Sequence, residues 1–392
     1  MTDLPATTSA LPQTGTTFQR VSQPTVRDIQ ITTHEINDIL RGVAGCPVTL
    51  VGLQRLIHAQ AALHRAHADE DLDGLKSMLK SRGSTLRGFV LHAEGVGPVA
   101  YAVYFPMIDG QGERVAYCED FFINEAFRGH GVANILFHQL AKKVMDEGAE
   151  KLQWATDKRN GPVHTFVQGK LGATHPDIIT ITANELLDET KPASLRLTEA
   201  WNGKEYKTRL LTPEDSNLVR QLGLSPNIIR LTGDLSFRGF VTTLRNKPDP
   251  VAITPGWTHL STFRLKEGIH LEQPVFADGH PTAKIVASVA QAARQHVQRN
   301  KLDYFRWHIK ESEGPMRDIL HDQLQLPIDS MLGNPESELI VYNLTNGALR
   351  KLATEVPDHV LHISTASPIG GSGANGGHTA YLPTDEPAPK RV

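Results

Sequence analysis

Residues 117–134 constrain the fold more than any other segment of the chain. They read Tyr-Cys-Glu-Asp-Phe-Phe-Ile-Asn-Glu-Ala-Phe-Arg-Gly-His-Gly-Val-Ala-Asn, which is an apolar strand with two adjacent acids, a turn with two glycines, and the start of a helix. A helix N-terminus presents unpaired backbone N–H groups and the positive end of the helix dipole. Glycines at 129 and 131 leave that backbone open to a phosphate group. The segment therefore predicts a strand–loop–helix unit with a pyrophosphate site on the loop. The order of strands and helices expected around it, over residues 29–183, predicts an α/β fold with a mixed sheet.

Two common phosphate-binding loops do not fit this segment, because no Gly-Lys-Ser/Thr follows the turn and the G-x-G-x-x-G spacing is absent. Residues 128–133 (R-x-x-G-x-A) resemble instead the R/Q-x-x-G-x-G/A loop of the GNAT N-acetyltransferases. Residues 119–123 (E-D-F-F-I) resemble more specifically the E-D-F-F-V strand of the spermidine/spermine (diamine) acetyltransferases. Residues 160–173 resemble the N-x-P … K-L-G-A helix of that family. The resemblance covers roughly residues 98–173.

This resemblance implies acetyl-CoA as the acyl donor. As acceptor it implies a primary amine of a small molecule, either a diamine or polyamine or an amino-acid-like compound. The strand backbone would bind the pantetheine arm, the loop would hold the pyrophosphate, and the later helix would contact the arm. Two alternatives stay open: an enzyme for a protein or antibiotic amine, and a non-catalytic acyl-CoA-binding sensor. The residues implied in cofactor binding are Phe121, Phe122, Ile123, Arg128, Gly129, His130, Gly131, Val132, Ala133, Asn134 and Asn160.

The two acids on the strand are the candidates for general base. An alkyl amine has a pKa near 10.4, so an acceptor at neutral pH must lose a proton before it attacks the thioester. Adjacent strand residues point to opposite faces, so only one of Glu119 and Asp120 can face the thioester. The resemblance nominates Glu119 as the base and leaves Asp120 to shape the amine site or to act structurally. The alternative for this pair is an ion pair with a nearby Lys or Arg.

The chain departs from the family at the residue expected to protonate the departing thiolate. The family commonly has a Tyr two turns into the later helix, and Val167 stands there. Either the thiolate leaves unaided or through water, or His164 or a tyrosine elsewhere, such as Tyr117, replaces the missing acid. A third interpretation of the missing Tyr is that the enzyme is slow, or that the protein is not an acetyltransferase.

The second half of the sequence repeats the first at a constant offset of 153 residues. Trp154 recurs as Trp307, and Glu119 recurs as Glu272. A Gly-Pro pair follows each tryptophan at the same distance. A shared offset over about 50 residues without gaps indicates duplication of a whole domain. The sequence therefore predicts tandem GNAT-like domains that form a pseudo-dimer within one chain.

The second copy lacks the residues on which the chemistry of the first depends. Its counterpart of the loop, residues 281–286, reads Pro-Thr-Ala-Lys-Ile-Val and has no glycine. Lys284 stands at the position of Gly131, where a side chain would keep a phosphate from the backbone. We expect a degenerate copy that acts as a structural partner. A specificity or regulatory domain that lines the first amine site is the alternative.

Composition limits the binding partners and the cellular location that we expect for this protein. The net charge is −3, and no basic stripe with interleaved aromatic residues is present, so nucleic acid is not expected as a partner. No run of 18 apolar residues occurs, so no membrane partner is expected. The two cysteines exclude a disulfide framework and a cysteine-based zinc site, and the histidines are scattered, so we expect no metal. A reducing, cytoplasmic location and a monomeric pseudo-dimer or a homodimer are the remaining expectations.

The chain of 392 residues suits two domains with tails. Thr, Pro, Gln and Ser dominate the first residues, and Gly and then Pro dominate the last ones. The predicted order is a flexible arm at 1–25, a catalytic GNAT domain at 26–190, a degenerate GNAT-like domain at 191–355, and a disordered tail at 364–392.

Overall fold

A computed structural model of the chain describes residues 25–365 apart from twelve short gaps. No helix in this described part is long and apolar enough to cross a membrane. The arm predicted at 1–25 and the tail predicted at 364–392 lie outside the described residues, except for Thr25, Ser364 and Thr365, which belong to strands. The gaps are 64–70, 82–85, 110–112, 175–177, 183–189, 191–204 apart from Leu197 and Trp201, 225–236 apart from Ile228, 262–265, 278–281, 311–313, 327–338 and 358.

A mixed sheet forms the centre of the first half. Among the described residues it has seven strands in the order β14-β5-β4-β3-β2-β1-β15, and only β4 and β5 are parallel neighbours. This mixed sheet confirms the predicted α/β class. The strands are β1 (Thr25–Glu35), β2 (Arg87–Ala93), β3 (Gly97–Ile108), β4 (Arg114–Ile123), β5 (Lys151–Asp157), β14 (Leu339–Thr345) and β15 (Val360–Thr365).

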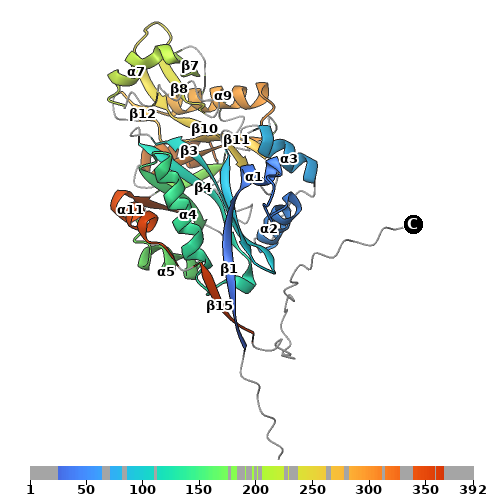
Figure 1. Ribbon diagram of the computed structural model, residues 1–392. Helices are drawn as coiled ribbons and strands as arrows, with labels where there is room; N and C mark the ends of the chain where they lie inside the picture. Colours follow the sequence, from blue (N-terminus) through green and yellow to red (C-terminus); the bar gives the residue numbers. More distant parts are fainter. Residues whose placement is uncertain are drawn as a thin grey trace, which may run out of the picture.

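Helices cover both faces of this sheet, because its central strands are apolar on both sides (Figure 1). Ala100 and Ala102 of β3 pack toward α4, α5 and α11, whereas Tyr101 and Val103 pack toward α1, α2 and α3. The buried residues of α4 include Val132, Leu136, Leu140 and Val144, which follow one another every four residues, as the sequence pattern predicts. The helices are α1 (Ile36–Arg41), α2 (Leu50–Leu63), α3 (Leu72–Ser81), α4 (Val132–Asp146), α5 (Gly161–Gly169) and α11 (Asn346–Thr354).

The second half lies across one end of the first sheet (Figure 1). Its described strands, joined by β6 from the first half, form two four-stranded sheets, β10-β11-β13-β6 and β12-β9-β8-β7. An apolar cluster joins the halves and contains Phe105 and Tyr117 from the first sheet and Val241 and Trp257 from the second half. The elements are β6 (Ile178–Thr182), β7 (Tyr206–Leu210), α7 (Ser216–Gln221), β8 (Phe240–Leu244), β9 (Pro250–Thr254), β10 (Gly256–Ser261), β11 (Lys266–Leu271), β12 (Val275–Phe276), α9 (Ala283–Arg299), β13 (Tyr304–Lys310) and α10 (Gly314–Arg317).

The two halves exchange strands. β6 comes from the first half and pairs with β13 of the second, whereas β14 follows the second half and pairs with β5 of the first. The sheets therefore cut across the boundary predicted at residue 190, and the segment from β14 to β15 completes the first sheet rather than the second. Local sequence patterns do not encode which edge strand joins which sheet, because edge pairing is set by long-range contacts.

The internal repeat is visible in the strand pairing. In the first half, β4 and β5 pair in parallel from Val115 with Lys151 to Cys118 with Trp154. In the second half, β11 and β13 pair in parallel from Gly268 with Tyr304 to Leu271 with Trp307. Every pair in one half has its counterpart 153 residues later, so the two halves share one core architecture.

Candidate active site

The site begins where two parallel strands separate. The β4–β5 ladder ends at Cys118 and Trp154, although β4 continues to Ile123 and β5 to Asp157. Beyond the last pair, β4 keeps its ladder to β3 on the other edge. An opening between parallel strands exposes backbone hydrogen-bonding groups that an extended ligand can pair with. The predicted strand residues Phe121, Phe122 and Ile123 lie along this opening.

The glycine loop follows directly and leads into α4. Gly129 and Gly131 have φ values of +80° and +87°, which favour glycine, and a Cβ added at either would meet no atom within 4 Å. The first backbone bonds of the helix run to the carbonyl of Gly131, from Asn134 at 2.9 Å and Ile135 at 3.4 Å. Within the described part of the chain, no hydrogen bond is made to the N–H groups of residues 129–133. The loop therefore presents open, unpaired donors at a helix N-terminus, which is the arrangement that binds phosphate groups.

The side chains of the loop have separate roles. Arg128 turns back onto the strand, where its Nε donates to the carbonyl of Ile123 at 3.1 Å and its guanidinium lies 5.9 Å from the ring of Phe122. His130 is exposed, whereas Val132 is buried in the core and anchors the first turn of α4. Val132 can therefore offer a ligand only its backbone.

A cavity of about 410 Å³ lies beside the first turns of α4. Asn134 and His138 of α4 line one wall, and α11 lines the other. Lys170 and Lys351 bring two positive charges to its lining, and Glu355, 3.6 Å from Lys351, brings one negative charge. The cavity therefore lies between α4 and α11, next to the loop, with one net positive charge on its lysine and glutamate side chains.

Glu119 occupies a β-bulge in β4. Val103 pairs with Asp120 and Tyr104 pairs with Cys118, so Glu119 is an extra residue between them. Bulges interrupt the alternation of side chains and re-aim them, so the expectation that Glu119 and Asp120 point to opposite faces does not apply here. The carboxylates of Glu119 and Asp120 nevertheless contact different parts of the protein.

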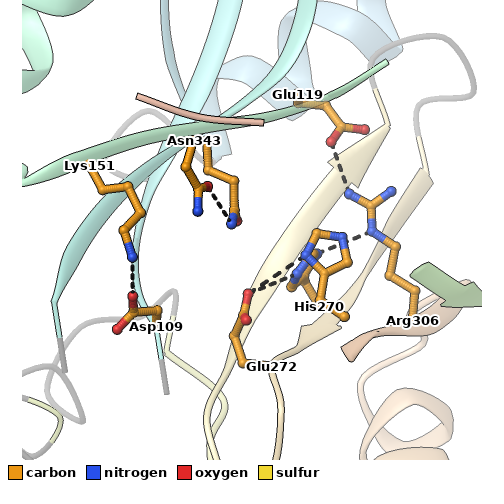
Figure 2. A network of polar contacts seen from close by, with 9 residues as sticks. Asp109, Glu119, Lys151, His270, Glu272, Arg306 and Asn343 are labelled. Atoms are coloured by element: carbon orange, nitrogen blue, oxygen red, sulfur yellow. Dashed lines mark hydrogen bonds and ion pairs between the residues drawn. The ribbon is translucent and has the colours of Figure 1, made fainter. Parts of the chain in front are cut away.

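The carboxylate of Glu119 faces the second half of the chain. Arg306 of β13 donates from Nη2 to Oε2 of Glu119 at 3.0 Å, and both side chains are largely buried, at 12% and 14% exposure (Figure 2). The guanidinium of Arg306 also lies 5.8 Å from the ring of Tyr117. The ion pair considered for this acid is therefore present, and its partner comes from 187 residues further along the chain.

Asp120 is buried at 4% exposure and faces α2. Gln60 of α2 donates from Nε2 to Oδ1 of Asp120 at 3.3 Å. A buried carboxylate that accepts a hydrogen bond from the covering helix fixes that helix on the sheet. These contacts support the structural alternative for Asp120.

A buried polar cluster lies behind Arg306 in the second half (Figure 2). Nε of Arg306 donates to Nδ1 of His270 at 3.2 Å, and Nε2 of His270 lies 3.2 Å from Oε1 of Glu272. His308 brings Nδ1 to 3.8 Å from the same oxygen. Because Nδ1 of His270 accepts from Arg306, Nε2 must carry the proton and donate it to Glu272.

His270, Glu272 and His308 have the residue types of a metal site, and their potential ligand atoms lie within 4.8 Å of one another. A metal on Nε2 of His270 would displace the proton that this nitrogen carries. The proton would have to move to Nδ1, which already faces the N–H of Arg306. The cluster is therefore arranged for hydrogen bonding, and it connects Glu272 through His270 and Arg306 to Glu119.

Burial gives Glu272 an unusual titration. Desolvation, reinforced by Asp109 and opposed by Lys151 and Arg306, raises its pKa to about 8. The folded protein then holds a proton that the unfolded chain releases near its ordinary pKa of 4.5, so stability falls as pH rises through this window, by up to ~1.4 kcal/mol per pH unit. We expect Glu272→Gln to remove this slope.

The measurement is urea unfolding of both proteins at several pH values between 5 and 8.5, with Glu355→Gln as control. Glu355 carries an exposed ion pair with Lys351, so its variant should keep the slope of the parent protein. Equal pH dependence of the parent and the Glu272 variant would contradict the assignment.

The residues expected near the departing thiolate lie in different environments. Val167 is fully buried in the core between the sheet, α4 and α11. Nε2 of His164 lies 3.0 and 2.9 Å from the carbonyls of Asp157 and Lys158, which fixes the ring at the end of β5. Asn160 precedes α5 without capping it through its side chain. The position where the family has its Tyr therefore points into the core here.

Tyr117 lies between the halves and is buried beside His270, His308 and Arg306. Burial raises the pKa of its hydroxyl above the usual range, so the group stays protonated at neutral pH. It therefore holds a proton, but its packing places it in the contact between domains.

Restoring the missing tyrosine should not create an acid. We expect Val167→Tyr to overpack the core and lower the free energy of unfolding by about 1–3 kcal/mol without raising turnover. Val163→Tyr, one turn earlier and only partly buried, is the matched control and should cost less. Chemical denaturation and acetyl-transfer rates check both variants, and faster turnover for Val167→Tyr alone would refute the buried placement.

Comparisons with known proteins identify a family for part of the chain and a fold for most of it. The model of the acetyltransferase (GNAT) family matches residues 55–173. Among curated proteins, none matches the sequence. A solved tandem GNAT protein from the clavulanic acid biosynthesis pathway, without AcCoA, is 12% identical with a TM-score of 0.50, and the match covers 81% of this chain and 98% of that chain. A GCN5-related N-acetyltransferase from Sphaerobacter thermophilus is 11% identical with a TM-score of 0.46, and covers 81% and 96%.

Residues 55–173 therefore match the model of the GNAT acetyltransferase domain, and this family uses acetyl-CoA. The likeness to the tandem GNAT protein extends over 81% of this chain and shows a tandem GNAT fold, as the internal repeat predicts. The finer resemblance to diamine acetyltransferases stays a prediction.

Sequence reasoning missed Arg306 and His270. The internal repeat contained a signal for both, since they correspond to Gln153 and Tyr117 at the offset of 153 residues. Arg306 is a charged residue at a position that corresponds to Gln153 in the central strand β5 of the first half, and a charge on such a strand indicates a buried polar contact.

Proposed function

We propose that this protein transfers an acetyl group from acetyl-CoA to a primary amine of a small molecule. The observation that carries the proposal is the open row of N–H groups at residues 129–133, next to the point where β4 and β5 separate. In this proposal the pyrophosphate lies on the loop, and the pantetheine arm runs along Phe121–Ile123 between the strands. Asn160 contacts the arm from the start of α5.

The adenosine end of CoA can be assigned to the cavity beside α4 in the same proposal. The cavity between α4 and α11 adjoins the loop at Asn134, and Lys170 leaves its lining with a net positive charge after Lys351 pairs with Glu355. We infer that the phosphorylated adenosine end of CoA lies there, because its phosphate is attracted by this positive charge.

Glu119 is the proposed general base. An acceptor ammonium that reaches its carboxylate gives up a proton, directly or through a water molecule, and the neutral amine attacks the thioester carbonyl. The nitrogen–carbon bond forms as the carbon–sulfur bond breaks. In this proposal no side chain protonates the thiolate, which leaves as such or takes a proton from water.

A second reading, the acyl-CoA-binding sensor, is favoured by one observation. Arg306 already occupies the carboxylate of Glu119, and a base in an ion pair is less available to an ammonium ion. The two readings differ in turnover and not in CoA binding.

The test is a calorimetric titration with CoA followed by a thiol-release assay with acetyl-CoA and a panel of diamines, polyamines, amino acids and aminoglycosides. CoA binding with turnover on one class of amine supports the enzyme. CoA binding without turnover on any amine supports the sensor, and absence of CoA binding refutes both.

A further inference from the structure

The second half of the chain places a guanidinium beside the proposed base of the first half. Arg306 and Glu119 are joined at 3.0 Å, and both are mostly shielded from solvent. Arg306 is fixed from behind by His270, which is fully buried and in turn bonded to Glu272. Because Glu119 is the proposed base, an acceptor that reaches its carboxylate also meets the guanidinium of Arg306.

This pair of charges discriminates between acceptors. A plain amine or a diamine brings only positive charge to Glu119, so it meets the repulsion of Arg306 at close range. An acceptor with both an ammonium and a carboxylate can insert into the pair, with its ammonium on Glu119 and its carboxylate on Arg306. Each buried charge then keeps a partner of opposite sign, which is the condition for burying charges without a large penalty. The planar fork of arginine also matches a carboxylate.

We propose that the acceptor is a zwitterion of the α-amino acid type, and that Arg306, contributed by the second domain, binds its carboxylate. This inference rests on the proposed function and deepens it. It gives the second half of the chain a role in acceptor specificity, even though its own loop lacks the glycines of the first. The His270–Glu272 contact serves to hold Arg306 in place.

The experiment measures acetylation of α-amino acids against their carboxamides and against the amines left by decarboxylation. These acceptors share the amine and differ in the carboxylate. A pool of each class is incubated with acetyl-CoA and the full chain, and products are detected by mass spectrometry. We expect the parent protein to prefer at least one amino acid over its carboxamide by roughly 10- to 100-fold in kcat/KM, the range for a charged hydrogen-bond pair.

Arg306→Gln is the informative variant, because glutamine is the counterpart residue of the first half, Gln153. It should abolish the preference by raising KM for amino acids while the rates for plain amines hold or rise. Arg306→Lys keeps the charge and should retain part of the preference. Arg209→Gln breaks another Arg–carboxylate pair of the second half, with Asp215 at 2.6 Å, and should leave the preference intact.

The outcomes separate this inference from the proposed function. Faster acetylation of carboxamides or plain amines than of amino acids would overturn the zwitterion while leaving the acetyltransferase standing. An equal loss on all acceptors in Arg306→Gln would make Arg306 a positioning residue for Glu119 and overturn the carboxylate contact. If no acceptor turns over, binding of the amino-acid and carboxamide pools to the CoA-bound protein decides, and equal binding overturns the inference. Thermal unfolding of each variant verifies that it is folded.

Discussion

Gly131→Glu should weaken CoA binding by at least ~100-fold, equivalent to about 2.7 kcal/mol. Gly131 has a φ of +87° and opens onto free space, so a side chain there projects into the space that a phosphate must use to reach the N–H groups. A carboxylate adds repulsion of the pyrophosphate to this obstruction. Calorimetric titration with CoA measures the change.

Gly95→Glu is the matched control for this variant. Gly95 has a φ of +72° in the turn between β2 and β3, and an added Cβ would also meet no atom within 4 Å. Both variants pay the same backbone strain of about 1–2 kcal/mol, so comparable losses of stability are expected. Only the Gly131 variant should lose CoA affinity, and unchanged affinity there would remove the loop from the site.

Glu119→Gln should lower the rate of acetyl transfer by about 10²- to 10⁴-fold at pH 7, the contribution usual for a general base. The loss should shrink as the pH approaches the pKa of the acceptor amine, because an amine that is already neutral needs no base. Rates of thiol release over a range of pH, with the acceptor found in the panel, provide the measurement.

Two comparisons separate catalysis from structure for this variant. Removing Glu119 leaves Arg306 without this carboxylate, so unfolding of the variant must be measured alongside its rate. Glu94→Gln, an exposed substitution in the turn after β2, should leave the rate unchanged. A rate loss of equal size at every pH would show that Glu119 positions the acceptor or the fold and takes no proton.

The local parts of this structure could be predicted from the sequence. The strand–loop–helix unit at 114–146 has the expected elements, since alternation and the 3.6-residue period are local signals. The repeat is equally readable, because the tryptophans and the acids share one offset. The glycine loop is also a local signal, since the positive φ values at 129 and 131 follow from residue type.

The contacts that define the acceptor site could not be predicted in this way. The bulge at Glu119 depends on a register shift against β3, and Arg306 reaches Glu119 from 187 residues away. Val167 lies on the predicted helix, but the side of the helix that it occupies depends on packing against α4 and α11. Each of these features arises from tertiary contacts rather than from a local pattern.

The strand exchange between the halves has a consequence for synthesis. β5 acquires its neighbour β14 only after 190 further residues, as the bond between Gln153 and Asn343 shows. During synthesis on the ribosome, the edge of the first sheet at β5 therefore stays open until β14 has emerged. β6 likewise stays without its neighbour until β13 has been made. A protein stopped near residue 190 would leave the outer edge of β5 open and β6 without β13, and exposed strand edges are sites of aggregation. Duplication has thus joined the two domains into a single folding unit that neither half can complete alone.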